Sequence, residues 1–363
     1  MAAVIDPWGS GLVESYEKTI KEFGLEKFSA ELFPKPNRIM RRGAVFASRD
    51  QQRIADCIRE KKPYYALSGI MPSAEQIHFG NKMVVENLAY FQEHGAKTYI
   101  LVADLEAAAT RGISLEEAQR RAKNFHIPAY IALGLNPKKT IFYFQSENRK
   151  VMNLAYGFAT RITLNEFRAI YGSAEPSRIM AAVTQVADIV YPQLEERMPG
   201  VIPVGIDQDP HIRLTRDVVS RTRTQYGFIP PSAVYNIFTP SLDGSMKMSK
   251  SSPESCISLP EDTLSVCRKL QRALSGGRVS VEEHRRLGGE PEKDMVFELL
   301  RLHLMDDDSE LARISEEYRA GRMLTGDLKK IGCDLMTRFM NDFVAKLEKA
   351  RSQVDRLEFV KFS

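Results

Sequence analysis

The central part of the chain alternates between short apolar runs and longer stretches in which apolar residues recur at helical spacing. Continuous short apolar runs are typical of strands that are buried on both faces of a sheet. The predicted strands are Tyr64–Ser68, Thr98–Asp104, Thr140–Gln145, Val201–Ile206 and Ala233–Phe238, and the helix candidates between them are Lys82–Glu93, Leu115–Phe125 and Arg178–Leu194. Strands that are separated by helices predict right-handed crossovers and a mostly parallel, doubly wound sheet.

The regions before and after this alternation have a different character. Residues 1–60 are predicted to form an N-terminal appendage, with helices around Val13–Phe23 and near Gln51–Lys61. Residues 256–363 are predicted to be helical, and they end in a long helix over Gly326–Leu357. We therefore predict an α/β protein with a Rossmann-type doubly wound parallel sheet at residues 61–255, an N-terminal appendage and an all-helical C-terminal domain.

Composition and charge set only broad limits on function. Of the 363 residues, 43% are hydrophobic and 27% are charged, and the net charge of +4 permits a polyanionic partner without requiring one. The four cysteines form no CxxC pair and have no histidine at metal-ligand spacing, so we expect reduced thiols and no metal site. The chain starts without a signal-peptide pattern and contains no apolar run near the ~20 residues of a membrane span. We expect a cytoplasmic protein that has no membrane partner.

Two lysines lie three residues apart in the segment Ser245–Ser252, directly after the turn-rich residues 240–244. Lys247 and Lys250 are therefore expected on a mobile loop. Ammonium groups on long flexible stems suit a phosphate whose charge moves during a reaction. Taken alone, such a run is more simply a solvated loop.

A second segment, Pro72–Asn81, follows the first predicted strand and leads into a helix that begins near His78. Backbone amides and a helix N-terminus in this setting can hold phosphate. His78 and Asn81 could donate hydrogen bonds to phosphate oxygens, and Gly80 would let an adenine ring lie against the backbone. The simpler alternative for His78 is a histidine at the helix start that is satisfied by its neighbours.

A third segment, Val204–Asp217, follows a predicted buried strand and opens at the edge of the sheet where ligands bind. Asp207 and Gln208 stand side by side there and could bind a ribose hydroxyl and an amino acid. Taken by itself, this segment is more simply interpreted as a capped turn in which Asp207 or Asp209 lies at a helix N-terminus.

Together, the first two segments resemble the signature motifs of class I aminoacyl-tRNA synthetases. Residues 247–251 match the "KMSKS" motif, and residues 78–81 match the "HIGH" motif, in which Phe79 and Asn81 depart from the consensus. The string Asp-Gln-Asp-Pro at 207–210 is similar to the tryptophanyl-tRNA synthetases of the archaeal and eukaryotic branch. The resemblance covers nearly the whole chain, from residues 6–8 to residues 323–326.

The resemblance implies activation of L-tryptophan by ATP to tryptophanyl-adenylate and pyrophosphate, followed by transfer to tRNA(Trp). It implies ATP with Mg²⁺ as substrate, a homodimer, and an anticodon-binding role for the C-terminal helices. The catalytic residues that it implies are His78, Asn81, Lys247 and Lys250. The implied ATP-binding residues are Pro72, Ser73, Gly80, Gly205, Asp207, Met248, Ser249 and Ser251. The implied tryptophan-binding residues are Glu106, Gln185, Gln208, Leu67 and Leu101.

The expected indole pocket departs from that of the eukaryotic relatives. In those enzymes a tyrosine and a glutamine bind the indole N–H, and the matching positions here are Leu67 and Leu101. Leucines pack against an indole but accept no hydrogen bond, and a buried unpaired N–H costs about 1–3 kcal/mol. Either another acceptor exists or the pocket is wetter than expected. A tyrosine-specific synthetase, a small-molecule nucleotidyltransferase of the related superfamily and a tRNA-binding paralogue without catalysis stay open as alternatives.

Overall fold

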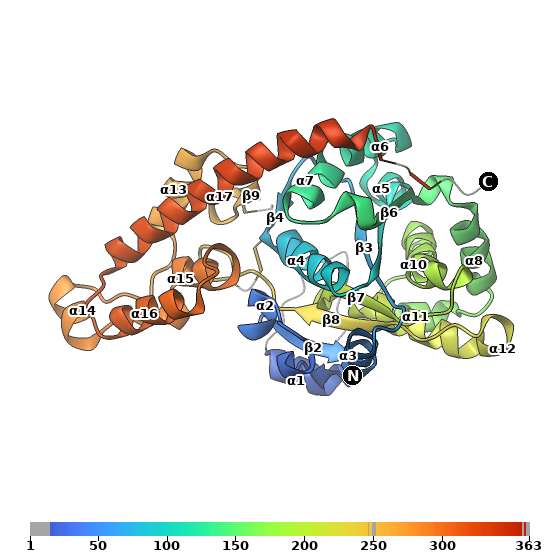
Figure 1. Ribbon diagram of the computed structural model, residues 1–363, viewed down its shortest axis with the longest axis horizontal. Helices are drawn as coiled ribbons and strands as arrows, with labels where there is room; N and C mark the ends of the chain where they lie inside the picture. The colour runs from blue at the N-terminus through green and yellow to red at the C-terminus, as the bar shows by residue number, and fades with distance from the viewer. Residues whose placement is uncertain (1–14, 246, 249–251, 358, 361–363) are drawn as a thin grey trace.

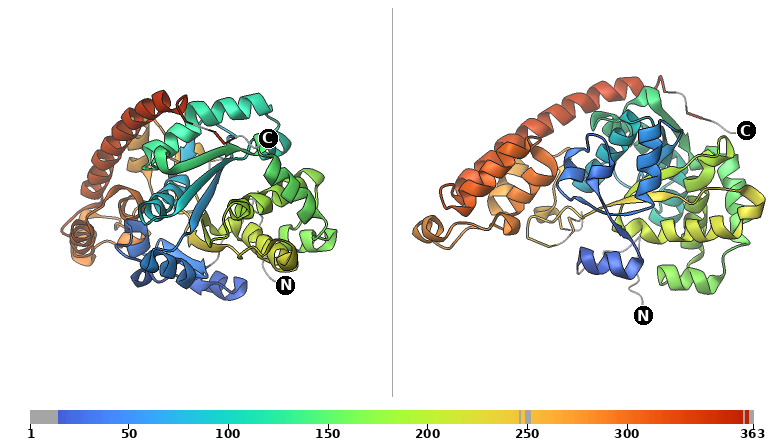
Figure 2. Two further views of the ribbon diagram at one scale, coloured as in Figure 1. Left: turned by 45° about the vertical axis from the view of Figure 1, so that its right-hand side comes forward. Right: turned by 60° about the horizontal axis from the view of Figure 1, so that its bottom comes forward.

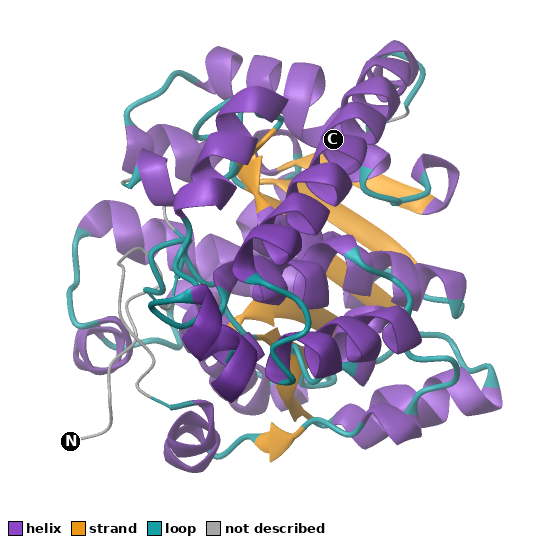
Figure 3. Cartoon of the chain, turned by 90° about the vertical axis from the view of Figure 1, so that its left-hand side faces the viewer, coloured by secondary structure: helices purple, strands orange, loops and turns teal. Residues whose placement is uncertain are grey.

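A seven-stranded sheet forms the centre of the computed structural model, which describes residues 15–245, 247–248, 252–357 and 359–360. The strand order is β1-β2-β8-β7-β3-β5-β6, and β4 and β9 form a separate two-stranded sheet. The strands are β1 (Glu26–Lys27), β2 (Val45–Arg49), β3 (Tyr65–Ile70), β4 (Ile77–His78), β5 (Lys97–Val102), β6 (Thr140–Phe144), β7 (Gly200–Gly205), β8 (Ser232–Asn236) and β9 (Ser258–Leu259). Figure 3 shows the large sheet as a layer between helices.

The parallel part of the sheet has the doubly wound order that the sequence predicted. Strands β6, β5, β3, β7 and β8 are parallel neighbours, and they correspond to the predicted strands with ends that shift by a few residues. Their order across the sheet reverses between β3 and β7. In such folds the carboxyl ends of the two strands at the reversal open a crevice for ligands.

The N-terminal region contributes two strands to this sheet, β1 and β2, which were not predicted from the sequence. Strand β2 pairs antiparallel with β8, and β1 pairs antiparallel with β2. Arg49 at the end of β2 forms an ion pair with the fully buried Asp209, with 2.9 Å between Nε and Oδ1. The separation of residues 1–60 as an appendage stays a prediction, and residues 45–49 pair with β8 in the central sheet.

Helices cover both faces of the sheet (Figure 1). They are α1 (Tyr16–Phe23), α2 (Arg38–Arg41), α3 (Gln51–Glu60), α4 (Phe79–Glu93), α5 (Asp104–Arg111), α6 (Leu115–Arg121), α7 (Ile127–Ala132), α8 (Arg149–Ala159), α9 (Leu164–Tyr171), α10 (Pro176–Val190), α11 (Asp209–Arg221) and α12 (Arg223–Tyr226). Side chains alternate between the two faces along each strand, so Leu67 joins one buried apolar cluster and Ala66 joins the other. The sheet is therefore buried on both faces, as the continuous apolar runs predicted.

The C-terminal part is helical after β9, as predicted, whereas β9 itself lies within residues 256–363, which were predicted to be all helical. Its helices are α13 (Thr263–Arg272), α14 (Val281–Leu287), α15 (Met295–Leu299), α16 (Asp308–Arg319) and α17 (Thr325–Val354). Figures 1 and 2 show this part at one side of the α/β part, with the long α17 running back to pack against α7. Phe343 and Leu347 on α17 belong to a third buried cluster that joins the two parts. Within the described ranges, no helix combines the length and apolar character that a bilayer crossing requires.

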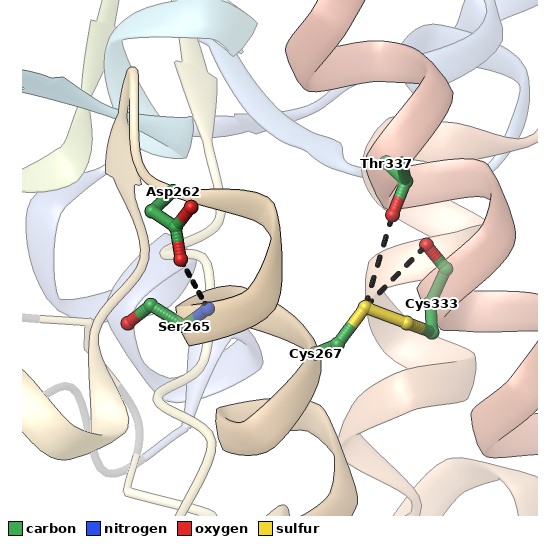
Figure 4. The surroundings of a disulfide bond; sticks show 5 residues. All are labelled: Asp262, Ser265, Cys267, Cys333 and Thr337. Carbon is green, nitrogen blue, oxygen red and sulfur yellow. Dashed lines mark hydrogen bonds between the residues drawn. A yellow bond between two sulfur atoms is a disulfide. The ribbon is translucent and has the colours of Figure 1, made fainter.

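Two of the four cysteines are bonded, so the expectation of reduced thiols is wrong for this pair. Cys267 on α13 and Cys333 on α17 form a disulfide between the two helices (Figure 4). Cys57 and Cys256 are buried and are not part of this disulfide. The bonded cysteines are separated by 66 positions in the sequence, and only the packing of α13 against α17 brings them together.

Candidate active site

A cavity of about 420 Å³ lies at the carboxyl ends of β3, β5, β7 and β8, where the strand order reverses. The predicted site residues that line it are Leu67, His78, Gly80, Asn81, Leu101, Glu106, Gln185, Gly205, Asp207, Gln208, Lys247 and Met248. Pro72 and Ser73 are not among the described residues that line it. Ser249, Lys250 and Ser251 lie outside the described residues, so their roles stay predictions.

His78 caps the N-terminus of α4 and also lines the cavity. Its ring Nδ1 accepts a hydrogen bond from the backbone N–H of Gly80 at 3.0 Å. Asn81 Oδ1 accepts a hydrogen bond from the backbone N–H of His78 at 3.1 Å, which completes a reciprocal cap. Because Nδ1 is an acceptor, the neutral ring carries its proton on Nε2, which is then the nitrogen able to donate to a phosphate.

Gly80 is required by the His78 ring itself. A Cβ at position 80 would lie 2.8 Å from His78 Cε1 and 2.9 Å from Nδ1, closer than side chains pack. From the sequence, this glycine was expected to let an adenine ring lie against the backbone. The structure adds a second reason, since a side chain here would displace the capping histidine.

The first motif is fixed in place by contacts on both sides. Arg121 Nη1 donates a hydrogen bond to the carbonyl oxygen of Ser73 at 2.6 Å, and His126 Nε2 lies 2.7 Å from the carbonyl oxygen of Ala74. In the two-stranded sheet, His78 pairs with Ser258, which follows the lysine loop in the sequence. This backbone pairing joins the first segment to residues that lie a few positions after the lysine loop.

Lys247 lies beside the third predicted segment. Its Nζ is 3.0 Å from Asp207 Oδ2 and 4.8 Å from the centre of the Phe238 ring. The next residue, Met248, is buried, and its backbone N–H donates to the carbonyl oxygen of Thr239 at 2.8 Å. The start of the loop is thus anchored, and its cation lies at the cavity wall next to the acid that was predicted to bind ribose.

Polar groups from other elements complete the cavity wall. Glu106 is in the first turn of α5, and Gln185 projects from α10. The start of α5 is fixed by Asp104, a fully buried carboxylate that accepts hydrogen bonds from the Ser146 backbone N–H at 3.1 Å and from Gln119 Nε2 at 3.0 Å. This network positions Glu106 at the ligand edge of the sheet.

Gln145, which was not predicted as a site residue, directly follows β6 and lines the cavity. Its Nε2 donates a hydrogen bond at 2.6 Å to Asp188, a fully buried residue of α10, and Tyr143 donates to the same carboxylate at 2.8 Å. Burial raises the pKa of Asp188 to about 7. A signal was available, because Gln145 is a polar residue at the carboxyl end of a predicted buried strand.

His211 is a second cavity residue that the analysis gave no role. It is buried on α11, and its Nδ1 lies 2.9 Å from the Tyr171 hydroxyl. Burial lowers the pKa of His211 to about 3, so the ring is neutral at ordinary pH. The cavity wall therefore carries the ion pair of Lys247 with Asp207, and the neutral ring of His211 lies elsewhere on the same wall.

Comparison with known proteins agrees with this geometry. The family model described as tRNA synthetases class I (W and Y) matches residues 59–339. The chain is 42% identical to a tryptophan–tRNA ligase of Hyperthermus butylicus, with 98% of this chain and 97% of the relative covered. It is 41% identical to the tryptophan–tRNA ligase of Methanocaldococcus jannaschii, with 96% of each covered. The crystal structure of the tryptophanyl-tRNA synthetase of Aeropyrum pernix superposes with a TM-score of 0.89 at 40% identity and covers 98% of this chain and 100% of that one. The chain therefore belongs to the class I tRNA synthetases of the W and Y family.

Proposed function

We propose that the protein is a tryptophan–tRNA ligase, which activates L-tryptophan with ATP and then transfers it to tRNA(Trp). The observation that carries the proposal is one cavity that collects His78, Asp207 and Lys247 from segments far apart in the sequence. Relatives of nearly equal length bear the name tryptophan–tRNA ligase, which disfavours a tyrosine-specific enzyme or a paralogue without catalysis.

In the activation step, a carboxylate oxygen of tryptophan attacks the α-phosphorus of ATP. The bond from that phosphorus to the oxygen that bridges to the β-phosphate breaks, and pyrophosphate leaves with the bonding electrons. Such a reaction depends mainly on positioning and on stabilising charge. His78 Nε2–H would donate to a phosphate oxygen, and Lys247 would balance the negative charge that develops on pyrophosphate.

The ion pair between Lys247 and Asp207 bears on how ATP binds. A phosphate would compete with Asp207 for the ammonium group, and Asp207 would then be released to accept a hydrogen bond from a ribose hydroxyl. The side chains of Lys247 and Asp207 are 28% and 19% exposed, so exchanging partners needs little change in burial. Gly205 lets the Asp207 side chain lie against the backbone, since a Cβ there would be 2.5 Å from Asp207 Oδ1.

Magnesium is expected to enter with ATP. The described residues contain no group of three or more acidic, histidine or cysteine side chains that could hold a metal ion. Mg²⁺ bound through phosphate oxygens and water needs no such protein cage, so the residues present fit this mode. The ion would offset phosphate charge, while Lys247 and His78 fix the orientation of the phosphates.

The other cavity residues suit the amino acid. Glu106 would bind the α-amino group, and Gln185 and Gln208 would bind the remaining polar atoms of the substrate backbone. Leu67 and Leu101 would pack against the indole ring. The C-terminal helices would bind the anticodon part of tRNA(Trp), and we further propose a homodimer and a cytoplasmic location, in line with the resemblance.

The experiment that tests this proposal is charging of a tRNA(Trp) transcript with labelled tryptophan or tyrosine. The proposal predicts charging with tryptophan and none with tyrosine at equal concentration. His78→Ala should reduce the charging rate strongly while the protein stays folded. Charging with tyrosine, or charging that is unaffected by His78→Ala, would overturn it.

A further inference from the structure

The residues that were predicted to surround the indole ring leave its N–H without an acceptor. Leu67 and Leu101 both line the cavity and are almost fully buried. They belong to the apolar cluster on the face of the sheet that α10 covers. A ring placed against them would bury its N–H, so a protein acceptor is needed nearby.

Gln145 is a polar residue of this wall with a buried acceptor that has no partner among the described residues. It lines the cavity and is 1% exposed. Its Oε1 is buried and has no hydrogen-bond partner among the described residues. A buried acceptor without a partner is unfavourable, which indicates that a donor from a ligand or a water completes it.

The orientation of the Gln145 amide is set by its neighbour. Asp188 Oδ2 accepts from Gln145 Nε2 at 2.6 Å, and Asp188 Oδ1 accepts from the Tyr143 hydroxyl at 2.8 Å. An ionised carboxylate only accepts hydrogen bonds, so it holds the NH₂ end of the amide and turns Oε1 away from α10. Tyr143 stands opposite Leu101 in the register of β5 and β6, which puts this network beside the two leucines.

We propose that Gln145 Oε1 accepts the hydrogen bond of the indole N–H and that Asp188 holds the amide in the orientation this requires. Gln145 is then a specificity residue for tryptophan, and Asp188 is a positioning residue that acts through it. The inference rests on the proposed function, since it concerns the substrate of the same cavity.

The experiment compares tryptophan with its sulfur isostere, β-(3-benzothienyl)alanine, which has the same shape but no N–H. The rate of ATP–pyrophosphate exchange at pH 8 gives kcat/KM for each amino acid. Wild-type protein should prefer tryptophan by about tenfold or more, because the isostere leaves Oε1 unpaired. Gln145→Met keeps the length of the side chain without the acceptor, and should bring this ratio close to one.

Gln193→Leu is the matched control. Gln193 is also a buried glutamine, but it bonds to the backbone of Ile229 and is not among the described residues of the cavity wall. This variant can lower stability, yet it should keep the wild-type ratio. A merely structural role for Gln145 would reduce activity with both amino acids equally and leave the ratio unchanged.

The outcomes separate this inference from the proposed function. Absence of exchange with tryptophan in the wild type contradicts the proposed function. Exchange with tryptophan and an unchanged ratio in Gln145→Met contradicts only the role of Gln145. If that variant does not fold, a crystal structure of the wild type with tryptophan decides: an indole nitrogen within about 3.2 Å of Gln145 Oε1 supports the inference, and any other partner overturns it.

Discussion

Replacing Gly80 by alanine tests the link between the first motif and the chemistry with a single methyl group. The added Cβ would lie 2.8 Å from His78 Cε1, whereas ordinary contact begins at 3.4 Å, so the ring must move by 0.6 Å or rotate away. Either change breaks the 3.0 Å hydrogen bond from the Gly80 N–H to Nδ1. The donor on Nε2 moves with the ring.

The expected magnitudes differ between stability and activity. Loss of an N-terminal cap costs about 0.5–2 kcal/mol, while glycine to alanine in a helix gains about 0.5–1 kcal/mol. The net change in the free energy of unfolding should therefore stay within about 1.5 kcal/mol. Displacement of a positioned donor can cost about 100-fold in rate. We expect kcat/KM for ATP to fall by about that factor, with the KM for tryptophan little changed.

ATP–pyrophosphate exchange and chemical denaturation measure these two quantities on the same preparations. Gly326→Ala is the control, because Gly326 lies in the first turn of α17 and a Cβ there would meet no atom within 4 Å. The control should be as stable as the wild type or slightly more so, with the same exchange rate. Full activity in Gly80→Ala, within about threefold of the wild type, would refute a catalytic role that depends on the position of His78.

Three further predictions follow from other contacts. Lys247→Met removes the cation that lies beside Asp207 at the cavity wall, and single-turnover adenylate formation should slow by about 100- to 1000-fold while tryptophan still binds. A normal rate would exclude Lys247 from the reaction. Thiol titration of the unfolded protein without reductant should detect only Cys57 and Cys256, and four reactive thiols would show that the disulfide is absent. Because the disulfide closes a loop across 66 positions, Cys333→Ser should lower the free energy of unfolding by up to about 4 kcal/mol. Burial raises the pKa of Asp188 from 3.8 to about 7, so the folded protein keeps a proton that the unfolded chain releases. The contribution of this proton to the free energy of unfolding is complete in acid and is lost as the pH rises through 7. Between pH 5 and pH 8 the wild type should therefore lose about 3 kcal/mol more stability than Asp188→Asn, and equal losses in denaturant titrations would contradict the buried carboxylate.

The parallel strands and most of the cavity could be predicted because they depend on local signals. A continuous apolar run identifies a buried strand, and a polar residue directly after it lies at the ligand edge, as with Asp207 after β7. The resemblance implied that Lys247 acts on the phosphates of ATP and that Asp207 binds its ribose, and the contact between the two side chains is an addition from the structure. The order of the strands in the sheet then brings these segments together at one edge of it.

The features that were missed depend on contacts between distant parts of the chain. Strand β2 is short and ends in Arg49, whose partner Asp209 is 160 positions away, so no local pattern distinguishes it from a loop. The Cys267–Cys333 disulfide needs the packing of α13 on α17. The capping contact of Asn81 Oδ1 with the His78 N–H was also missed, although the position of Asn81 three residues after the cap could have indicated it. Its role as a donor to the ligand stays a prediction.

The most direct test of the account is ATP–pyrophosphate exchange with each of the twenty amino acids in the absence of tRNA. The account predicts exchange with tryptophan alone, which would show that the cavity around His78, Asp207 and Lys247 activates this amino acid. Exchange with tyrosine would contradict the assignment of Leu67, Leu101 and Gln145 to an indole pocket. Absence of exchange with every amino acid would contradict the activation chemistry itself.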